Sequence, residues 1–312
     1  MANINATGNS QVNILNGNGG NNTLSGGIGN DVLNGGAGND TLDGGSEIDT
    51  ASYAGASGPV TVSLAIAGAQ ATGGAGTDTL IGIENLTGSS FNDTLTGSVG
   101  NNLIDGGLGN DTMSGGDGND TYLVDSSTDN VVEGSTGGTA DVIFASVTYT
   151  LAGRFVETLA LTGTANIDAI GNNQANTLVG NDGNNTLSGS LGNDFLEGGL
   201  GNDTLTGGGQ ADTFSFRSAL GSTNIDTITD FVVVDDTIRI ANSIFTGLAA
   251  GTLSAAAFFI GAAANDADDR IIYNSATGAL FFDSDGTGGN AAIQFATLSA
   301  GLALTNADFF VV

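Results

Sequence analysis

The chain has 312 residues with 53 Gly, one Pro, no His, Cys or Trp and a formal net charge of -29, and its four basic residues are all Arg. The lack of His, Cys and Lys excludes imidazole-based catalytic triads, thiolate chemistry, Walker A phosphate loops and Schiff-base catalysis. The charge repels phosphate backbones and anionic lipids and favours small cations. No apolar stretch approaches the ~20 residues of a membrane span. We therefore expect no nucleic-acid partner and no membrane insertion.

A nine-residue period, with the consensus G-G-x-G-x-D-x-U-x in which U is a large apolar residue, divides the chain. In chain order we predict repeat block 1 at residues 1–52, a spacer at 53–87, block 2 at 88–123, a second spacer at 124–170, block 3 at 171–215 and a C-terminal region at 216–312. One further copy of the repeat, GGAGTDTLI, stands alone at 73–81.

Each repeat predicts a turn followed by a short strand. Glycines at positions 1, 2 and 4 supply positive φ and let the backbone curl with its carbonyls inward. Positions 7–9 form the strand, and the residue at position 8 points to one face because side chains alternate. These residues are predicted to form one apolar column between two sheets: Leu15, Leu24, Leu33, Leu42, Leu95, Met113, Leu178, Leu187, Leu196 and Leu205.

Position 6 is Asp or Asn, a hard oxygen ligand. If two repeats make one coil, turns on the same edge lie 18 residues apart in sequence and about 4.8 Å apart in space. The same-edge pairs are then Asn13–Asp31, Asp31–Asp49, Asn22–Asp40, Asp93–Asp111, Asn102–Asp120, Asn176–Asp194, Asn185–Asp203 and Asp194–Asp212. Backbone carbonyls complete six or so oxygen ligands, which suits Ca²⁺ better than Mg²⁺ or softer metals. We expect about eight calcium ions.

Asn precedes Asp at position 6 along blocks 1 and 3. Position 6 is Asn in the first two turns of both blocks and Asp in the next three. Asn contributes no charge, so the leading turns are expected to bind calcium more weakly. Without ions, stacked carboxylates repel one another over a thin core, and we expect the calcium-free chain to be largely unfolded.

The in-phase tandem copies of G-G-x-G-x-D-x-U-x resemble the RTX (repeats-in-toxin) nonapeptide family. The resemblance implies an all-β fold, a right-handed parallel β-roll that forms a calcium-bound solenoid, with a C-terminal β-rich capping and export region. In this family such rolls usually follow a protease, lipase, epimerase or toxin domain, and none is visible here beside the roll, spacers and C-terminal region.

The two spacers are rich in Val, Ile, Thr and Leu with strand-like alternation, as in residues 60–64 and 142–151. Both end in similar phrases, IENLTGSS at 83–90 and VETLALTGT at 156–164, just before the repeats resume. We predict that they form extra, less regular coils that continue the sheets. The alternative is that they are separate globular inserts.

The C-terminal region has a different composition, with eleven of the fifteen Phe lying after residue 213. It can therefore build an ordinary aromatic core, and 270–286 predicts a hairpin turning at 274–278. Asp226 and Asp230 are candidates for a further ion. Turn capping is the better interpretation of Asp283 and Asp285, and Asp268 and Asp269 are expected on the solvated surface.

The last five residues, an acid followed by four apolar residues (308–312), resemble the uncleaved C-terminal signal of substrates of type I ABC exporters. The alternative is simply a last β-strand, and both readings are compatible. The N-terminal segment MANINATGNS lacks the basic and apolar regions of a cleaved secretory signal, which agrees with type I export.

The favoured function is a secreted calcium-binding β-roll protein without catalysis of its own, at the cell surface or in an extracellular matrix. Its expected partners are calcium ions, a type I ABC exporter during secretion and further copies of itself in a filament or sheet, giving a structural or adhesive role. One alternative is a calcium-folding and export module that serves an extracellular hydrolase, lyase or epimerase. A lesser alternative is ice binding, suggested by Asn at position 5 of many repeats.

Overall fold

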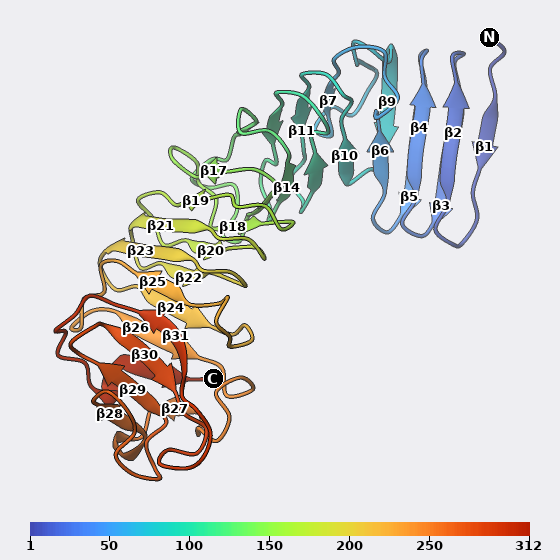
Figure 1. The fold of residues 1–312 in the computed structure, drawn as a ribbon. Coiled ribbons are helices and arrows are strands. Elements are labelled where there is room, and N and C mark those ends of the chain that lie inside the picture. Colours follow the sequence, from blue (N-terminus) through green and yellow to red (C-terminus); the bar gives the residue numbers. More distant parts are fainter. The chain divides into compact units, whose positions relative to one another are not determined.

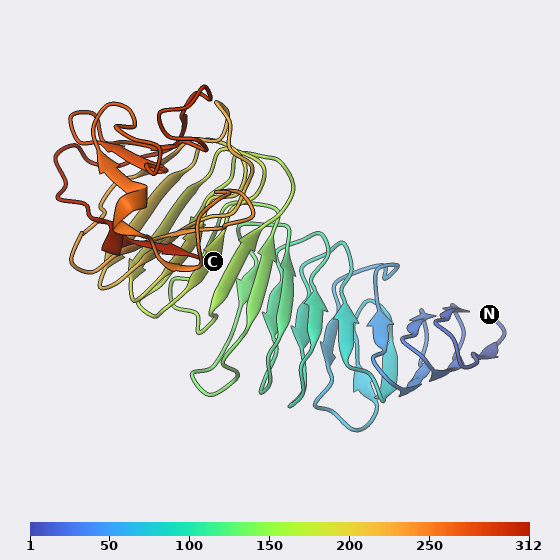
Figure 2. The same ribbon diagram turned by 90° about the horizontal axis from the view of Figure 1, so that it is seen from below.

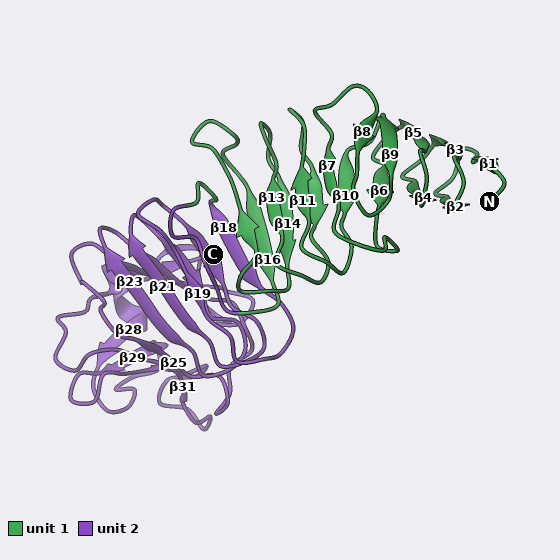
Figure 3. Cartoon of the chain, turned by 90° about the horizontal axis from the view of Figure 1, so that it is seen from above, with its two compact units in different colours: residues 1–147, 154–156 green, residues 148–153, 157–312 purple.

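Short strands separated by glycine-rich turns make up nearly all of the protein. The computed structural model describes all residues, 1–312, and its only helical elements are two single 3-10 turns, η1 (Ala255–Ala257) and η2 (Asn306–Asp308). The chain divides into two compact units (Figure 3): residues 1–147 with 154–156 form unit 1, and residues 148–153 with 157–312 form unit 2.

Unit 1 has two layers of strands that alternate along the chain (Figure 1). One layer contains, in spatial order, β2 (Ile14–Asn18), β4 (Val32–Gly36), β6 (Thr50–Ser52), β10 (Asn85–Thr87), β12 (Leu103–Asp105), β14 (Thr121–Val124) and β16 (Val142–Ala145). The opposite layer contains β1 (Asn5–Thr7), β3 (Thr23–Ile28), β5 (Thr41–Ser46), β9 (Thr77–Ile81) and β8 (Gln70–Ala71), and then a separate sheet of β7 (Thr61–Ser63), β11 (Thr94–Thr96), β13 (Thr112–Ser114) and β15 (Asn130–Val131).

Unit 2 also has two layers of strands, and the last strands of both layers come from the C-terminal region (Figure 2). Its first layer is β18 (Thr158–Leu161), β20 (Thr177–Val179), β22 (Phe195–Glu197), β24 (Thr213–Phe216), β26 (Thr237–Ile240), β32 (Phe309–Val311) and β27 (Gly251–Thr252). Its second layer is β17 (Tyr149–Thr150), β19 (Ala169–Ile170), β21 (Thr186–Leu191), β23 (Thr204–Gly209), β25 (Asp226–Ile228), β31 (Ile293–Thr297), β30 (Ala279–Phe282), β29 (Ile271–Asn274) and β28 (Phe258–Ile260).

Strand register follows the repeat. Thr23 pairs with Thr41, and Ile14 pairs with Val32, so residues 18 positions apart lie side by side in parallel strands. Thr186 pairs with Thr204 in the same way in unit 2. Two repeats therefore form one coil, and the prediction of an all-β fold built as a parallel β-roll is confirmed.

The core of the roll is the predicted column of position-8 side chains. Leu24, Leu33, Leu95 and Leu196 are fully buried, as is Met113. The neighbouring residues at positions 7 and 9 are more exposed, as the alternation of a strand requires. Leu15 departs from the prediction and is only half-buried, because its strand β2 pairs on one side alone.

The spacers supply strands to the same layers. Within unit 1, β10 lies between β6 and β12, and β9 pairs with β5. The second spacer contributes β15 beside β13 and β16 beside β14.

The C-terminal region of unit 2 builds a separate aromatic core. Phe245 packs edge-on against Phe282 and Phe295, with ring centroids 5.3 and 5.0 Å apart. The predicted hairpin is present, since β29 and β30 pair antiparallel around residues 274–279. The final strand β32 pairs in parallel with β26, so the last residues do form a strand.

Candidate metal centre

The position-6 side chains form buried ladders along the edges of the roll. In each of the eight predicted pairs, the backbone N–H of the first residue donates to a side-chain oxygen of the second at 2.7–2.9 Å. The thirteen candidate ligands are all at most 3% exposed: Asn22, Asp31, Asp40, Asp49, Asp93, Asn102, Asp111, Asp120, Asn176, Asn185, Asp194, Asp203 and Asp212. The structure therefore brings together every pair that the spacing predicts.

One carboxylate oxygen remains without a hydrogen bond in most of these Asp residues. The buried Oδ2 atoms that lack a partner belong to Asp31, Asp40, Asp49, Asp111, Asp120, Asp194 and Asp203. Burying an ionised oxygen without a partner costs several kcal/mol in general, unless a cation or donor compensates. These orphaned oxygens are the first observation that fits a bound cation.

The glycine at position 1 lets a carboxylate oxygen and a carbonyl oxygen approach each other. A Cβ built on Gly26 would meet both Asp31 Oδ2 and the carbonyl oxygen of Gly44 in the next coil. The same holds for Gly189 in block 3. A carboxylate oxygen of one turn and a carbonyl oxygen of the next therefore lie close together, within reach of one cation, because no side chain stands at this position.

Backbone oxygens have to supply much of any coordination shell. No three acidic side chains gather into a group that could hold a metal ion. The available donors are one or two carboxylates with several carbonyl oxygens, all hard ligands in a flexible arrangement. That donor set fits Ca²⁺, whereas Mg²⁺ gives up its waters reluctantly and softer metals prefer nitrogen or sulfur.

The turns fall into two classes that differ at position 2. In one class position 2 has a φ between 76° and 108°, and its N–H does not reach the position-6 side chain. We call these the open turns: 26–31, 35–40, 44–49, 106–111, 115–120, 189–194, 198–203 and 207–212. All the orphaned position-6 oxygens of the repeats lie in open turns.

In the second class, position 2 is Asn or Ser, and its N–H donates to the position-6 side chain of the same turn. Examples are Asn18 to Asn22 at 2.7 Å and Asn181 to Asn185 at 2.8 Å. We call these the closed turns: 8–13, 17–22, 88–93, 97–102, 171–176 and 180–185. They are the first two turns of each block. Five candidate ligands lie in them, each with a side-chain oxygen already bonded: Asn22, Asp93, Asn102, Asn176 and Asn185.

Most carboxylates of the open turns have raised pKa values. Burial, reinforced by the nearby Asp129 and Asp93 and opposed by a backbone hydrogen bond, raises the pKa of Asp111 to about 7. Burial likewise raises the pKa of Asp194 to about 6. A cation that compensates the negative charge would hold these groups ionised, so calcium binding is coupled to proton release.

Asn side chains at position 5 form a second, exposed ladder. The Oδ1 atom of Asn21 accepts the N–H of Asn39 at 3.0 Å, and Asn184 accepts that of Asn202 at 2.9 Å. These oxygens therefore bond the next coil of the protein itself. This arrangement gives the position-5 Asn residues a structural role, distinct from the flat free array that ice binding requires.

Acids outside the blocks extend the ladders. Asp226, a sequence candidate for a further ion, accepts the N–H of Asp203 at 3.1 Å, and Asp236, which sequence reasoning missed, accepts that of Asp212 at 2.9 Å. The segment GSTNIDTIT at 221–229 carries Gly, Asp and Ile at the repeat positions 1, 6 and 8, which is the signal that aligns Asp226 with the ladder. In the first spacer, Asp78 has the same role toward Asp40.

The other acids of the C-terminal region serve turns. Asp230 accepts the N–H groups of Gly207 and Gly208 through its two oxygens, and Asp283 caps its own turn at Gly286. Asp285 accepts N–H groups from residues 289 and 290. The expectation of a solvated Asp269 is wrong: it is 4% exposed and accepts two backbone N–H groups, because the loop folds over it.

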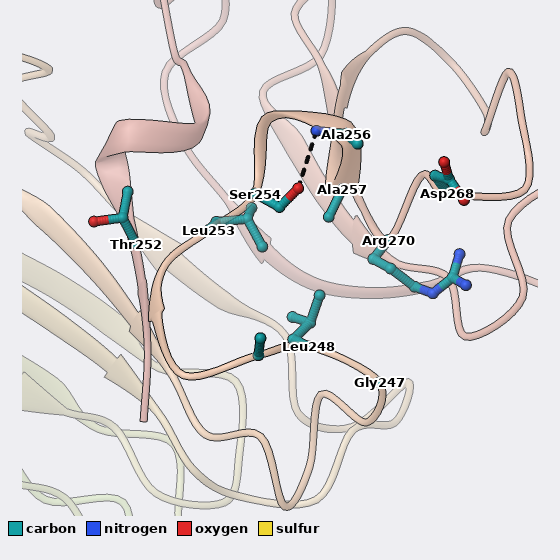
Figure 4. A pocket seen from close by; sticks show the side chains of 10 residues that line it. Gly247, Leu248, Thr252, Leu253, Ser254, Ala256, Ala257, Asp268 and Arg270 are labelled. Atoms are coloured by element: carbon teal, nitrogen blue, oxygen red, sulfur yellow. Dashed lines mark hydrogen bonds between the residues drawn. The ribbon is translucent and has the colours of Figure 1, made fainter.

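A pocket of about 300 Å³ lies beside η1 in unit 2 (Figure 4). Ser254 Oγ, one of its polar lining groups, accepts the N–H of Ala256 at 3.2 Å. The Arg270 guanidinium donates to the carbonyl oxygens of Ala267 and Asp269 at 2.7 and 2.9 Å. Ser254 and Arg270 thus hold the backbone of the loops around this pocket.

A family model matches the segments of the chain that carry the open and closed turns. The model of the RTX calcium-binding nonapeptide repeat matches residues 7–51, 87–122, 170–205 and 188–216. No curated protein matches the chain in sequence. Among similar solved structures is the extracellular lipase LipA from Serratia marcescens, with 14% identity and a TM-score of 0.18; the match covers 98% of this chain and 39% of the lipase.

The structure contains no helix with the length and apolar character needed to cross a membrane. The matched segments coincide with the three blocks in which the open and closed turns lie. The protein is therefore one that carries RTX calcium-binding nonapeptide repeats, arranged here as a parallel β-roll.

Proposed function

We propose that this protein folds on binding Ca²⁺ outside the cell and then serves a structural or adhesive role there. The observation that carries the proposal is the row of buried, orphaned carboxylate oxygens in the open turns. With one ion in each of the eight open turns, every such oxygen in the repeats gains a cation. The ligands are then the open-turn Asp residues and neighbouring carbonyls, and the closed turns need no ion.

Calcium binding and folding are one process in this proposal. The chain has a net charge of -29, nine of its carboxylates are buried at position 6 of the stacked turns, and the roll has only a thin column of apolar side chains between its layers. Removing the ions leaves like charges buried next to one another. The free energy of calcium binding therefore becomes free energy of folding.

The proposed location outside the cell follows from the calcium concentration that the sites require. Sites of the extracellular class have Kd values of about 10⁻⁴–10⁻³ M and fill in calcium-rich external media. Inside the cell the chain would stay unfolded and suited to threading through a type I ABC exporter. Asp308 to Val312 at its C-terminus would serve as the export signal before forming β32.

Self-assembly at a surface or in a matrix is supported by apolar side chains on the turns. At position 3 of three open turns, Ile28, Leu108 and Leu191 are 55%, 66% and 49% exposed. Exposed apolar groups on a regular edge favour association with other molecules. Further copies of the same chain present the same edge, which makes a homo-oligomer the expected partner.

A calcium titration followed by far-UV circular dichroism tests the folding step. The chain in excess EDTA is expected to lose its β spectrum and become sensitive to protease, and both changes should reverse at millimolar Ca²⁺. A protease-resistant β-roll in EDTA would contradict the proposal. Electron microscopy with and without Ca²⁺ tests assembly separately: filaments or sheets should appear only with Ca²⁺, and monomers under both conditions would remove the assembly role.

A further inference from the structure

The second spacer places an unusual turn on the end of block 2. Residues 133–141 stack on the open turn 115–120, and the N–H of Asp120 donates to Asp141 Oδ1 at 2.7 Å across 21 residues. Strand β16 follows directly and pairs with β14. The segment thus takes the place of a repeat turn, although it is three residues longer than the six-residue turns of the blocks.

Glu133 stands at position 1 of this turn, where every repeat of the three blocks has Gly. A Cβ at position 1 of a repeat would collide with the ligand oxygens, as it would at Gly26. The longer turn accommodates a side chain there. Glu133 Oε1 accepts the N–H of Gly115 at 3.1 Å and the hydroxyl of Tyr122.

The other oxygen of Glu133 is left without a hydrogen bond. The residue is only 6% exposed, and its Oε2 is buried with no partner. Two donors therefore fix the carboxylate through Oε1, and the fixed geometry aims Oε2 into the space between the two turns. Leaving such an oxygen unpaired is costly unless a cation lies beside it.

Backbone oxygens face Oε2 in that space. A Cβ built on Gly137 would lie 2.5 Å from Glu133 Oε2, 2.6 Å from the carbonyl oxygen of Gly116 and 3.2 Å from that of Gly134. The three oxygens, which belong to both turns, therefore lie within about 6 Å of one another beside Gly137, where no side chain intervenes. Ca²⁺–oxygen distances are about 2.3–2.6 Å, so small adjustments would bring all three into a coordination shell.

We propose that Glu133 creates a calcium site of its own in the spacer, in which Glu133 Oε2 and the carbonyl oxygens of Gly116 and Gly134 bind one Ca²⁺. The site rests on the proposed calcium-dependent function, but it uses a ligand outside the nonapeptide repeat. Its ion joins the last open turn of block 2 to spacer turn 133–141. It therefore stabilises a longer loop that has no repeat sequence of its own.

Equilibrium dialysis with radioactive Ca²⁺ tests the site in the full-length chain. Glu133→Gln keeps the shape of the side chain and its Oε1 acceptor but replaces the charged ligand, so it should bind one Ca²⁺ fewer than the wild type. Asp268→Asn is the matched control, because it removes the same charge from an exposed residue of the C-terminal region, outside every turn that is assigned an ion. It should bind as many ions as the wild type.

Equal ion counts in Glu133→Gln, Asp268→Asn and the wild type would overturn the site while leaving the proposed function intact. A wild type that binds no Ca²⁺ would overturn both. Circular dichroism at saturating Ca²⁺ establishes that Glu133→Gln is folded before its ions are counted.

A second measurement covers the case in which Glu133→Gln fails to fold. Tb³⁺ replaces Ca²⁺ and emits when excited through a phenol ring in contact with its site. Tyr122→Phe removes only the hydroxyl that bonds Glu133, and it should lower the tyrosine-sensitised emission more than Tyr273→Phe does, since Tyr273 bonds the backbone of the C-terminal region. Equal loss in the two variants would contradict the site.

Discussion

The first two turns of each block and the turns that follow share one backbone plan but satisfy position 6 in different ways. In the closed turn 17–22, the N–H of Asn18 bonds the Asn22 side chain. In the open turn 26–31, Gly27 has a φ of 108° and Asp31 Oδ2 has no partner. In the leading coil a backbone N–H group thus provides the partner of the position-6 oxygen. In the later coils that oxygen needs a cation instead.

This difference separates two ways of stabilising one solenoid. A closed turn is neutral at position 6, except at Asp93, and needs no ion to compensate its buried oxygen. An open turn buries a charge that only a bound ion can offset. We infer that the leading coil of each block keeps its turn geometry without calcium. The later coils of the block keep theirs only when calcium is bound.

The largest expected effect is that of pH on the calcium-free roll. In the folded state the pKa of Asp111 is about 7 and that of Asp194 about 6, against 3.8 for an ordinary Asp. The folded chain then binds more protons than the unfolded chain over this window, so folding without Ca²⁺ is favoured below about pH 4 and is lost as pH rises through 6–7. Circular dichroism in EDTA should show β structure at about pH 4 that disappears by about pH 7.5. Stability that increases with pH in EDTA would contradict the open-turn account.

Filling one cation space should have the next largest effect. Gly26→Ala places a Cβ between Asp31 Oδ2 and the Gly44 carbonyl, so it should remove one ion and lower the free energy of unfolding by about 1–3 kcal/mol, as for an unpaired buried group. Urea unfolding at saturating Ca²⁺ measures this loss. The control is Gly68→Ala, because a Cβ there meets nothing within 4 Å. Equal destabilisation by both changes would count against the site.

One chemical change can be made in both classes of turn. Asp194→Asn removes the charge of an open turn, and should raise the Ca²⁺ midpoint of folding by about tenfold, roughly 1.4 kcal/mol. Asp93→Asn makes the same change in a closed turn, where the Ser89 N–H still finds an acceptor. It should move the midpoint by much less. A larger shift from Asp93→Asn would reverse the assignment of the two classes.

The smallest expected effect is the gain of one bound Ca²⁺ in a closed turn. Asn18→Gly together with Asn22→Asp converts the closed turn 17–22 to the sequence of an open one and should add one bound Ca²⁺. The stability change should stay within about 1 kcal/mol, since the added flexibility of Gly opposes the new ion. Isothermal titration against Asn18→Gly alone measures the added site, and an unchanged ion count would show that position 2 does not control the turn.

The regular part of the fold was predictable because its physics is periodic. Alternation placed Leu24 and Leu33 inside, and the spacing of two repeats per coil placed Asp31 beside Asp49. These relations depend only on the strand repeat and on the distance between paired strands. Asp226 was a candidate ion ligand, but its pairing with Asp203 escaped prediction because an insertion separates the two residues by 23 positions.

The division into open and closed turns was not predictable from residue types alone. Position 6 distinguishes Asn22 from Asp31, but Asp93 lies in a closed turn. Position 2 is the better signal, yet Ser190 has a φ of 82° and its turn is open, whereas Ser98 lies in a closed turn. The residue type at position 2 therefore does not by itself decide the class of a turn.

The most direct measurement is anomalous diffraction from crystals grown with Ca²⁺, which locates each ion independently of the protein model. The account predicts a peak beside the position-6 carboxylate of every open turn, Asp31 and Asp194 among them, and no peak in closed turns such as 180–185. Peaks distributed equally over both kinds of turn, or open turns filled by water alone, would contradict it.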